Sequence, residues 1–233
     1  MRDRGIDTSA DPVYPDLVFG IPTPDCPPGD PATVGVGVMS YYGTNDDRKL
    51  ADELHAAYLR NTEDFIRWLL DNGRKVRIFS GDACDESAVQ QILGDVRASR
   101  PDLGPDQLAA ESVSTFAELT AAMMPVGSVV ATRYHNVMCA LKLGKPVIST
   151  GYAQKNIALM TDMGLAGFCQ SAGALDIDLL IEQFTKLEAE ATQLRSMIAG
   201  HNDDNARRLD EQFARLSATL FPGLARPLAI GRP

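Results

Sequence analysis

The residues best suited to chemistry lie close together in the chain, at Arg133, His135 and Asn136. They follow an apolar segment, 128–132, that is typical of a buried strand, and they precede a short helical segment, 137–143. At such a junction the free N–H groups of the helix already favour an anion. An arginine adds a bidentate fork for phosphate or carboxylate, and a histidine can donate to phosphate or move a proton near neutral pH. The pattern predicts an anion site, with Arg133 and His135 as its catalytic residues; the alternative is a structural histidine.

Other polar residues follow neighbouring predicted strands. In an open parallel sheet, ligands bind beyond the carboxyl ends of the strands. The substrate-binding residues expected at these positions are Ser40, Tyr41, Ser80, Asn136, Tyr152 and Lys155. Lys155 opens the helix after the fifth strand, so it is a second cation for the same anion, or else an ordinary surface lysine.

Two further patterns favour structure over chemistry. Asp82, Asp85 and Glu86 follow the second predicted strand, and they are expected to cap the next helix and not to hold a metal. Gly35 and Gly37 form G-x-G without the third glycine of the dinucleotide fingerprint, so a bound nicotinamide cofactor is not expected. We expect no cofactor and no metal site.

Composition limits the class of partner. The chain has 233 residues and a net charge of −9, which is unfavourable for binding nucleic acid or anionic lipid. Its four cysteines lack the spacing of a zinc site or a redox dithiol, and they are expected to be unpaired in a reducing compartment. There is no leader-like N-terminus and no long apolar run, so we predict a cytoplasmic protein without a membrane span.

Strand and helix patterns alternate between residues 33 and 170, and this predicts the fold class. We expect an α/β fold with an open, mostly parallel, Rossmann-like sheet and helices on both faces. The expected strands are 33–39, 75–79, 108–113, 128–132, 146–149 and 167–169, with 17–19 as a possible edge strand. Residues 1–31 are proline-rich and are predicted to be a linker, before a domain over 32–222 and a tail over 223–233.

Local signals place several helix ends. Thr115 and Glu118 form a capping box, and Gly73 and Gly144 are expected to terminate helices. Apolar residues at helical spacing over 180–220 predict two long C-terminal helices, with a break near 200–202. These helices pack on the sheet, on another domain or on a second subunit.

The segment from Val129 to Leu165 resembles the C-terminal signature of the polysaccharide pyruvyl transferase family. That signature has a strand, R-x-H, a helix, G-x-P, a second strand, an aromatic residue and a lysine. The matching residues are Arg133, His135, Gly144, Pro146, Tyr152 and Lys155. Near the start, Arg2 and Asp3 resemble the arginine–aspartate element of the same family.

The resemblance implies an activity and a fold. Members of the family transfer the pyruvyl group of phosphoenolpyruvate to two hydroxyls of a saccharide, and they have a GT-B-like fold of two Rossmann-like domains. By match to the motif, Arg133 and His135 are donor-site residues, and Arg2 is the corresponding arginine of the N-terminal element. The chain resembles the C-terminal, donor-binding half alone. A homodimer or a separate N-terminal half is therefore the expected partner, beside phosphoenolpyruvate and a saccharide acceptor.

Two other classes of function remain open from the sequence. The same strand ends can hold the diphosphate of a nucleotide sugar, as in a GT-B-like glycosyltransferase or an epimerase-like protein. The chain can also be an inactive interaction module that keeps the fold. Competition by a nucleotide sugar, and not by phosphoenolpyruvate, distinguishes the first of these from a pyruvyl transferase.

Overall fold

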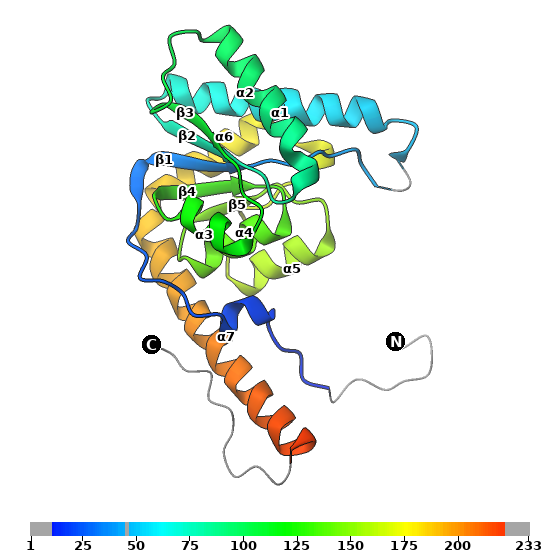
Figure 1. Cartoon of the computed structure of the whole chain (residues 1–233), viewed down its shortest axis with the longest axis vertical. Coiled ribbons are helices and arrows are strands. Elements are labelled where there is room, and N and C mark those ends of the chain that lie inside the picture. Colours follow the sequence, from blue (N-terminus) through cyan, green and yellow to red (C-terminus); the bar gives the residue numbers. More distant parts are fainter. Residues whose placement is uncertain (1–10, 45–46, 222–233) are drawn as a thin grey trace. The chain divides into compact units, whose positions relative to one another are not determined.

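The computed structural model describes residues 11–44 and 47–221, and the chain divides into two compact units. One unit is Asp25–Ala199, and the other joins Met1–Pro24 to Gly200–Pro233. The first holds the sheet and the strand ends where ligands are expected (Figure 1). The linker, domain and tail boundaries expected from composition, at residues 31 and 222, stay a prediction.

Five parallel strands form a single sheet in the order β3-β2-β1-β4-β5. The strands are β1 (Asp30–Gly37), β2 (Lys75–Phe79), β3 (Leu108–Glu111), β4 (Val126–Ala131) and β5 (Val147–Ser149). In the centre, Val36 of β1 lies opposite Ile78 of β2 and Val130 of β4. Strands β2 and β3 are added in turn on one side of β1, and β4 and β5 are added on the other side. The strand order therefore reverses between β1 and β4, which is where ligands bind in open α/β sheets.

Helices cover both faces of the sheet, as the sequence predicts (Figure 1). They are α1 (Ala51–Asp71), α2 (Glu86–Ser99), α3 (Phe116–Met123), α4 (Tyr134–Lys142), α5 (Gln154–Asp162), α6 (Ile177–Ala189) and α7 (Ala191–Leu220). Helix α1 packs against α2 and α6, while α4 packs against α3 and α5. The predicted fold class is thus confirmed.

Several local predictions are confirmed by the helix ends. Gly73 and Gly144 both take positive φ angles directly after α1 and α4, where an L-residue with a side chain is strained. At α3, the Thr115 hydroxyl accepts from the Glu118 N–H, and the Glu118 carboxylate accepts from the Thr115 N–H. This is both halves of the predicted capping box.

Three predictions about elements are wrong. Residues 17–19 are part of a short 3-10 helix, Leu17–Gly20, because the Asp16 carboxylate caps it by accepting from the Val18 N–H. In the expected strand 167–169, only Cys169 bridges to β5. Helix α7 runs unbroken through 200–202, and the break lies at Glu190. One glycine inside a helix costs only about 1 kcal/mol, which the burial of Ile198 and Leu209 on either side outweighs.

The smaller unit pairs the N-terminal segment with the second half of α7. A Cβ added at Gly20 would lie 3.2 Å from Leu209 Cδ1. Arg208 donates to the carbonyl of Val13, and Arg215 donates to the Tyr14 hydroxyl. No helix in the described ranges has the length and apolar character needed to cross a bilayer.

Candidate functional site

The carboxyl ends of three neighbouring strands, β1, β4 and β5, are held together by a network of hydroxyl groups. The Tyr58 hydroxyl of α1 accepts from the Met39 N–H, 3.2 Å away, and lies 2.8 Å from the Thr132 hydroxyl. The Thr132 hydroxyl in turn lies 2.8 Å from that of Thr150, after β5. All three side chains are buried, and burial raises the pKa of Tyr58, so its phenol stays protonated. These hydrogen-bonded hydroxyl groups join the residues that follow β1, β4 and β5, next to the candidate site.

Arg133, at the start of α4, forms an ion pair with Asp85 of the same protein. Its Nε donates to Asp85 Oδ2 at 2.8 Å, and its Nη2 donates to Asp85 Oδ1 at 2.7 Å. The Asp85 side chain is fully buried, whereas that of Arg133 keeps a quarter of its surface exposed. Asp85 Oδ1 also accepts from the Ser40 N–H at 2.9 Å. The hydrogen bonds to Asp85 raise the pKa of Arg133, which stays charged.

The expectation that Asp85 caps a helix is wrong, because the Asp85 carboxylate pairs with Arg133. Asp82 does cap, since its carboxylate accepts from the Cys84 N–H, but Asp85 makes no side-chain cap at α2. The Arg133 guanidinium was expected to bind a ligand with two parallel hydrogen bonds. Its Nε–Nη2 edge instead donates both hydrogen bonds to the Asp85 carboxylate. Nη2 also donates to Cys84 Sγ at 3.3 Å, a weak acceptor that a ligand oxygen can replace. No acceptor for Nη1 is found in residues 11–44 and 47–221, so the outer edge of the guanidinium is the part open to an anion.

His135 lies in a cavity of about 280 Å³. The cavity is lined by residues 80–83 after β2, residues 113–116 after β3, Leu119 of α3, and His135. We call it the His135 cavity. Ser80, a predicted substrate-binding residue, is buried and lines it, whereas Arg133 does not. The structure therefore places the two expected catalytic residues in different surroundings, although they are two positions apart.

The walls of the His135 cavity carry negative charge. Asp82 lines it, and the hydrogen bond from the Cys84 N–H lowers the pKa of its carboxyl. Next to the wall, the backbone N–H groups of Ser114 and Thr115 lower the pKa of Glu118. Both carboxyl groups are ionised at neutral pH, because the pKa of each is lowered from an ordinary value that is already acidic. The cavity lining includes no lysine or arginine.

A third group of side chains gathers on the β5 side. The Tyr41 ring is buried and lies 5.6 Å from the ring of Tyr152, which is exposed. Lys155 Nζ lies 4.4 Å from the centre of the Tyr134 ring, a cation–π contact, and the Tyr134 ring meets that of His135 edge-on. Tyr134 therefore links the predicted cation Lys155 to the predicted histidine.

Asn136 is fully buried, and neither polar atom of its amide has a partner in the described ranges. The amide lies against two glycines. A Cβ at Gly37 would lie 2.5 Å from Asn136 Nδ2, and one at Gly81 would lie 2.9 Å from Asn136 Oδ1. Both glycines are at strand ends beside the site, so a larger residue would displace this amide. Buried amides are rarely left unpaired, and Asn136 is therefore a candidate for pairing with a ligand or a water molecule.

The structure thus distributes the predicted site residues, apart from the buried Asn136, over three groups. Arg133 and Ser40 meet at Asp85, His135 and Ser80 line the cavity, and Tyr41, Tyr152 and Lys155 lie toward β5. Arg2 lies outside the described residues. Sequence reasoning missed Asp85 as the partner of Arg133, and also Tyr58; the only signal for Asp85 was a carboxylate soon after a strand end.

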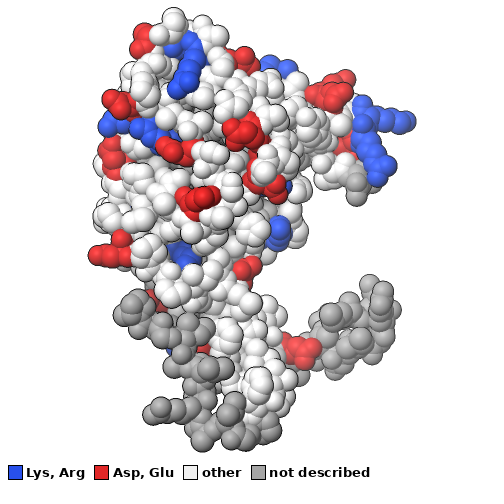
Figure 2. Space-filling model, in the orientation of Figure 1, with Lys and Arg blue, Asp and Glu red and all other residues white. Residues whose placement is uncertain are grey.

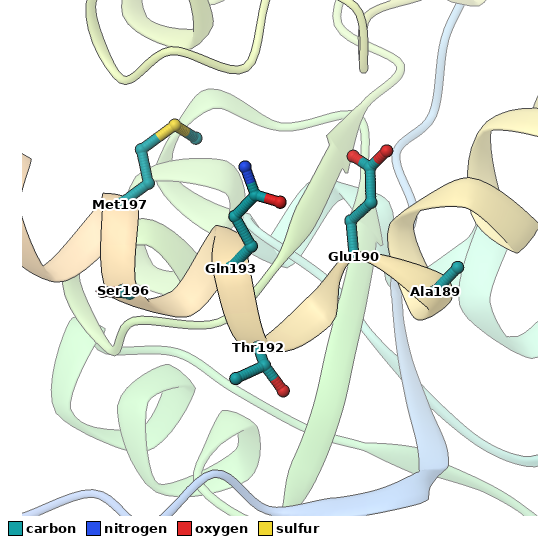
Figure 3. A pocket seen from close by; sticks show the side chains of 6 residues that line it. All are labelled: Ala189, Glu190, Thr192, Gln193, Ser196 and Met197. Atoms are coloured by element: carbon teal, nitrogen blue, oxygen red, sulfur yellow. The ribbon is translucent and has the colours of Figure 1, made fainter.

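Other surfaces of the described residues are weaker candidates for a ligand site. A larger, shallow hollow of about 680 Å³ lies at the turn between α6 and α7, with Glu190, Gln193 and Met197 along it (Figure 3). None of its lining residues follows a strand. On the face shown in Figure 2, acidic and basic side chains are interspersed, without an extended patch of one sign. Within the described ranges, no group of three or more histidine, cysteine or carboxylate side chains is arranged to hold a metal ion.

Comparison with known proteins locates the fold. No protein-family model and no curated protein matches the chain. Among solved structures, the glycosyltransferase VinC in complex with dTDP is similar, with 16% identity and a TM-score of 0.53 over 91% of this chain. The fold is that of one Rossmann-like half of a GT-B structure. The match covers only 45% of VinC.

A second similar structure is a point mutant of S. aureus TarM in complex with fondaparinux, alpha-GlcNAc-glycerol and UDP. It has 13% identity and a TM-score of 0.45, over 86% of this chain and 36% of TarM. The likeness to VinC, at 16% identity, establishes the GT-B-like fold and no activity.

Proposed function

We propose that this chain is the donor-binding half of a polysaccharide pyruvyl transferase, and that its donor is phosphoenolpyruvate. The supporting observation is the junction of β4 and α4, at the carboxyl end of β4 and beside the reversal of strand order between β1 and β4. The open edge of Arg133, the start of α4 and His135 lie together there, with Lys155 reached through Tyr134. A helix N-terminus and an arginine both favour a dianionic phosphate.

The proposed reaction forms a cyclic ketal. Two saccharide oxygens bond to C2 of phosphoenolpyruvate, and the bond from C2 to the phosphate oxygen breaks. One hydroxyl proton ends on C3, which becomes a methyl group, and the other leaves with the phosphate. Arg133 and the α4 N-terminus stabilise the charge that develops on the departing phosphate. His135, at the same helix start, is suited to carry one of the two protons.

Thermal unfolding with and without phosphoenolpyruvate tests the proposal. A ligand at 100 times its Kd stabilises by about 2.7 kcal/mol, a rise in Tm of roughly 5–10 °C for a chain of this size. Arg133 also holds Asp85, so its substitution alters stability for two reasons. His135→Gln and Lys155→Gln change exposed side chains, and each should reduce the rise in Tm while lowering the Tm of the free protein by no more than about 2–4 °C, through lost contacts with the Tyr134 ring. No rise with phosphoenolpyruvate in the full chain would refute the proposed donor.

A nucleotide-sugar glycosyltransferase is the second candidate. The likeness to VinC, a glycosyltransferase solved with dTDP, favours it. The same Arg133 edge and α4 N-terminus suit a diphosphate. A rise in Tm with dTDP or a UDP-sugar, and none with phosphoenolpyruvate, would select this candidate over the first.

A further inference from the structure

The His135 cavity and the Arg133 edge differ in the ligand that each favours. Arg133 offers a charged donor edge, next to the N-terminus of α4. The cavity has no lysine or arginine in its lining, and it includes the ionised Asp82; the Cys84 N–H and, from outside the lining, Arg133 lower the pKa of the Asp82 carboxyl. A phosphate placed in the cavity would meet a like charge, which costs free energy. The cavity is therefore suited to a part of the substrate that carries no negative charge.

The cavity lining combines one carboxylate, several hydroxyls and an apolar surface. Asp82 supplies the carboxylate, and Ser80 is one of the hydroxyl residues. The apolar part comes from Val113 and Leu119, both buried, together with the half-buried Phe116. A pyranose ring has matching features, because its hydroxyls donate strongly to a carboxylate and its C–H faces pack on apolar side chains. A cavity of about 280 Å³ also suits a single sugar ring in size.

We infer that the His135 cavity binds one neutral sugar ring of the saccharide acceptor, with Asp82 accepting hydrogen bonds from its hydroxyls. This inference rests on the proposed function, since it names where the acceptor binds. It places an acceptor subsite on this chain and not only on an opposing domain. His135 lines the cavity and also begins α4 beside Arg133, so a sugar in the cavity brings its hydroxyls next to the donor phosphate.

Saturation-transfer NMR on the full chain, with the methyl glycosides of glucose, galactose and mannose as probes, measures binding in the cavity. Asp82→Asn keeps the size of the side chain and an oxygen that can accept from the Cys84 N–H. It should weaken glycoside binding by about tenfold, because a charge-assisted hydrogen bond becomes a neutral one. Ala83→Trp adds a large ring at an exposed lining position and should abolish glycoside binding.

Matched controls use sites outside the cavity. Ala117→Trp places the same ring on the exposed face of α3, and Asp102→Asn removes a carboxylate from an exposed ion pair with Arg100. Both should bind glycosides as the unaltered protein does. Phosphoenolpyruvate should bind Asp82→Asn as tightly as the unaltered protein or more tightly, because a nearby negative charge is gone.

The outcomes separate this inference from the proposed function. Glycoside binding that is absent, or that survives Ala83→Trp, would overturn the inference. If Ala83→Trp abolishes phosphoenolpyruvate binding, or if dTDP displaces the glycosides, the cavity belongs to a donor and the inference is wrong. If glycosides bind and phosphoenolpyruvate does not, the cavity assignment stands while the proposed donor fails.

Discussion

Arg133 and His135 are two residues apart at the start of α4, and their surroundings differ in packing and in charge. Arg133 is paired with the fully buried Asp85, which also accepts from the Ser40 N–H. His135 is exposed and lines a cavity whose walls carry no cation. The side of Arg133 that faces Asp85 is closed by contacts within the protein, whereas the outer edge of Arg133 and the His135 side are open. Contacts on the closed side should govern stability, and the groups on the open side should govern ligand binding.

Arg133→Met is expected to have the largest effect on the closed side. It leaves the Asp85 carboxylate buried without its partner, which costs about 3–5 kcal/mol of unfolding free energy. Arg133→Met combined with Asp85→Asn should recover part of this loss, because no buried charge remains. Chemical denaturation measures both variants.

Arg100→Met is the control for that prediction. Arg100 forms exposed ion pairs with Asp71 and Asp102, so its loss should cost no more than about 1 kcal/mol. If Arg133→Met lowers the free energy of unfolding by no more than Arg100→Met does, the ion pair with Asp85 contributes little to stability. The closed side of Arg133 would then not be the side that governs stability.

Tyr58→Phe comes next in size. It removes the acceptor of the Met39 N–H and a partner of the Thr132 hydroxyl, and it leaves buried polar groups unpaired. The expected loss is about 1–3 kcal/mol. Tyr42→Phe is a matched control, since Tyr42 is exposed and stacks on His55. Equal stability of the two variants would contradict a structural role for the hydroxyl chain under the strand ends.

These two effects also indicate what the sequence can and cannot reveal. The parallel sheet follows from short apolar runs that alternate with helical spacing, and the ends of α1 and α4 follow from Gly73 and Gly144. The Arg133–Asp85 pair joins residues 48 positions apart, so no local pattern identifies it. Helical periodicity could not locate the break between α6 and α7, because Gly200 resembles a helix end although burial on either side carries the helix through it.

A smaller effect is expected at the wall of the His135 cavity. Thr115→Ala removes the cap of α3, and the free energy of unfolding should fall by about 1 kcal/mol.

The pKa of Glu118 in the folded protein lies below its value in the unfolded chain. The stabilising contribution of Glu118 is therefore complete above the unfolded pKa and is lost as the pH falls through the folded pKa. Glu118→Gln should therefore reduce the dependence of stability on pH in the acidic range. Urea unfolding at several pH values measures it, and an unchanged pH profile would contradict the ionised cap.

Asn136→Ala should have the smallest effect on stability, and it tests whether the two sides share a ligand. A buried side chain usually costs several kcal/mol when it is truncated to alanine. The Asn136 amide, however, has two polar atoms without partners in the described ranges, and their desolvation opposes folding. The change in unfolding free energy should therefore stay below about 1 kcal/mol. If a bound ligand pairs with this amide, phosphoenolpyruvate should raise the Tm of Asn136→Ala less than that of the unaltered protein. An equal rise in Tm would show that Asn136 does not contact the donor, and would restrict the donor site to the Arg133 edge and the start of α4.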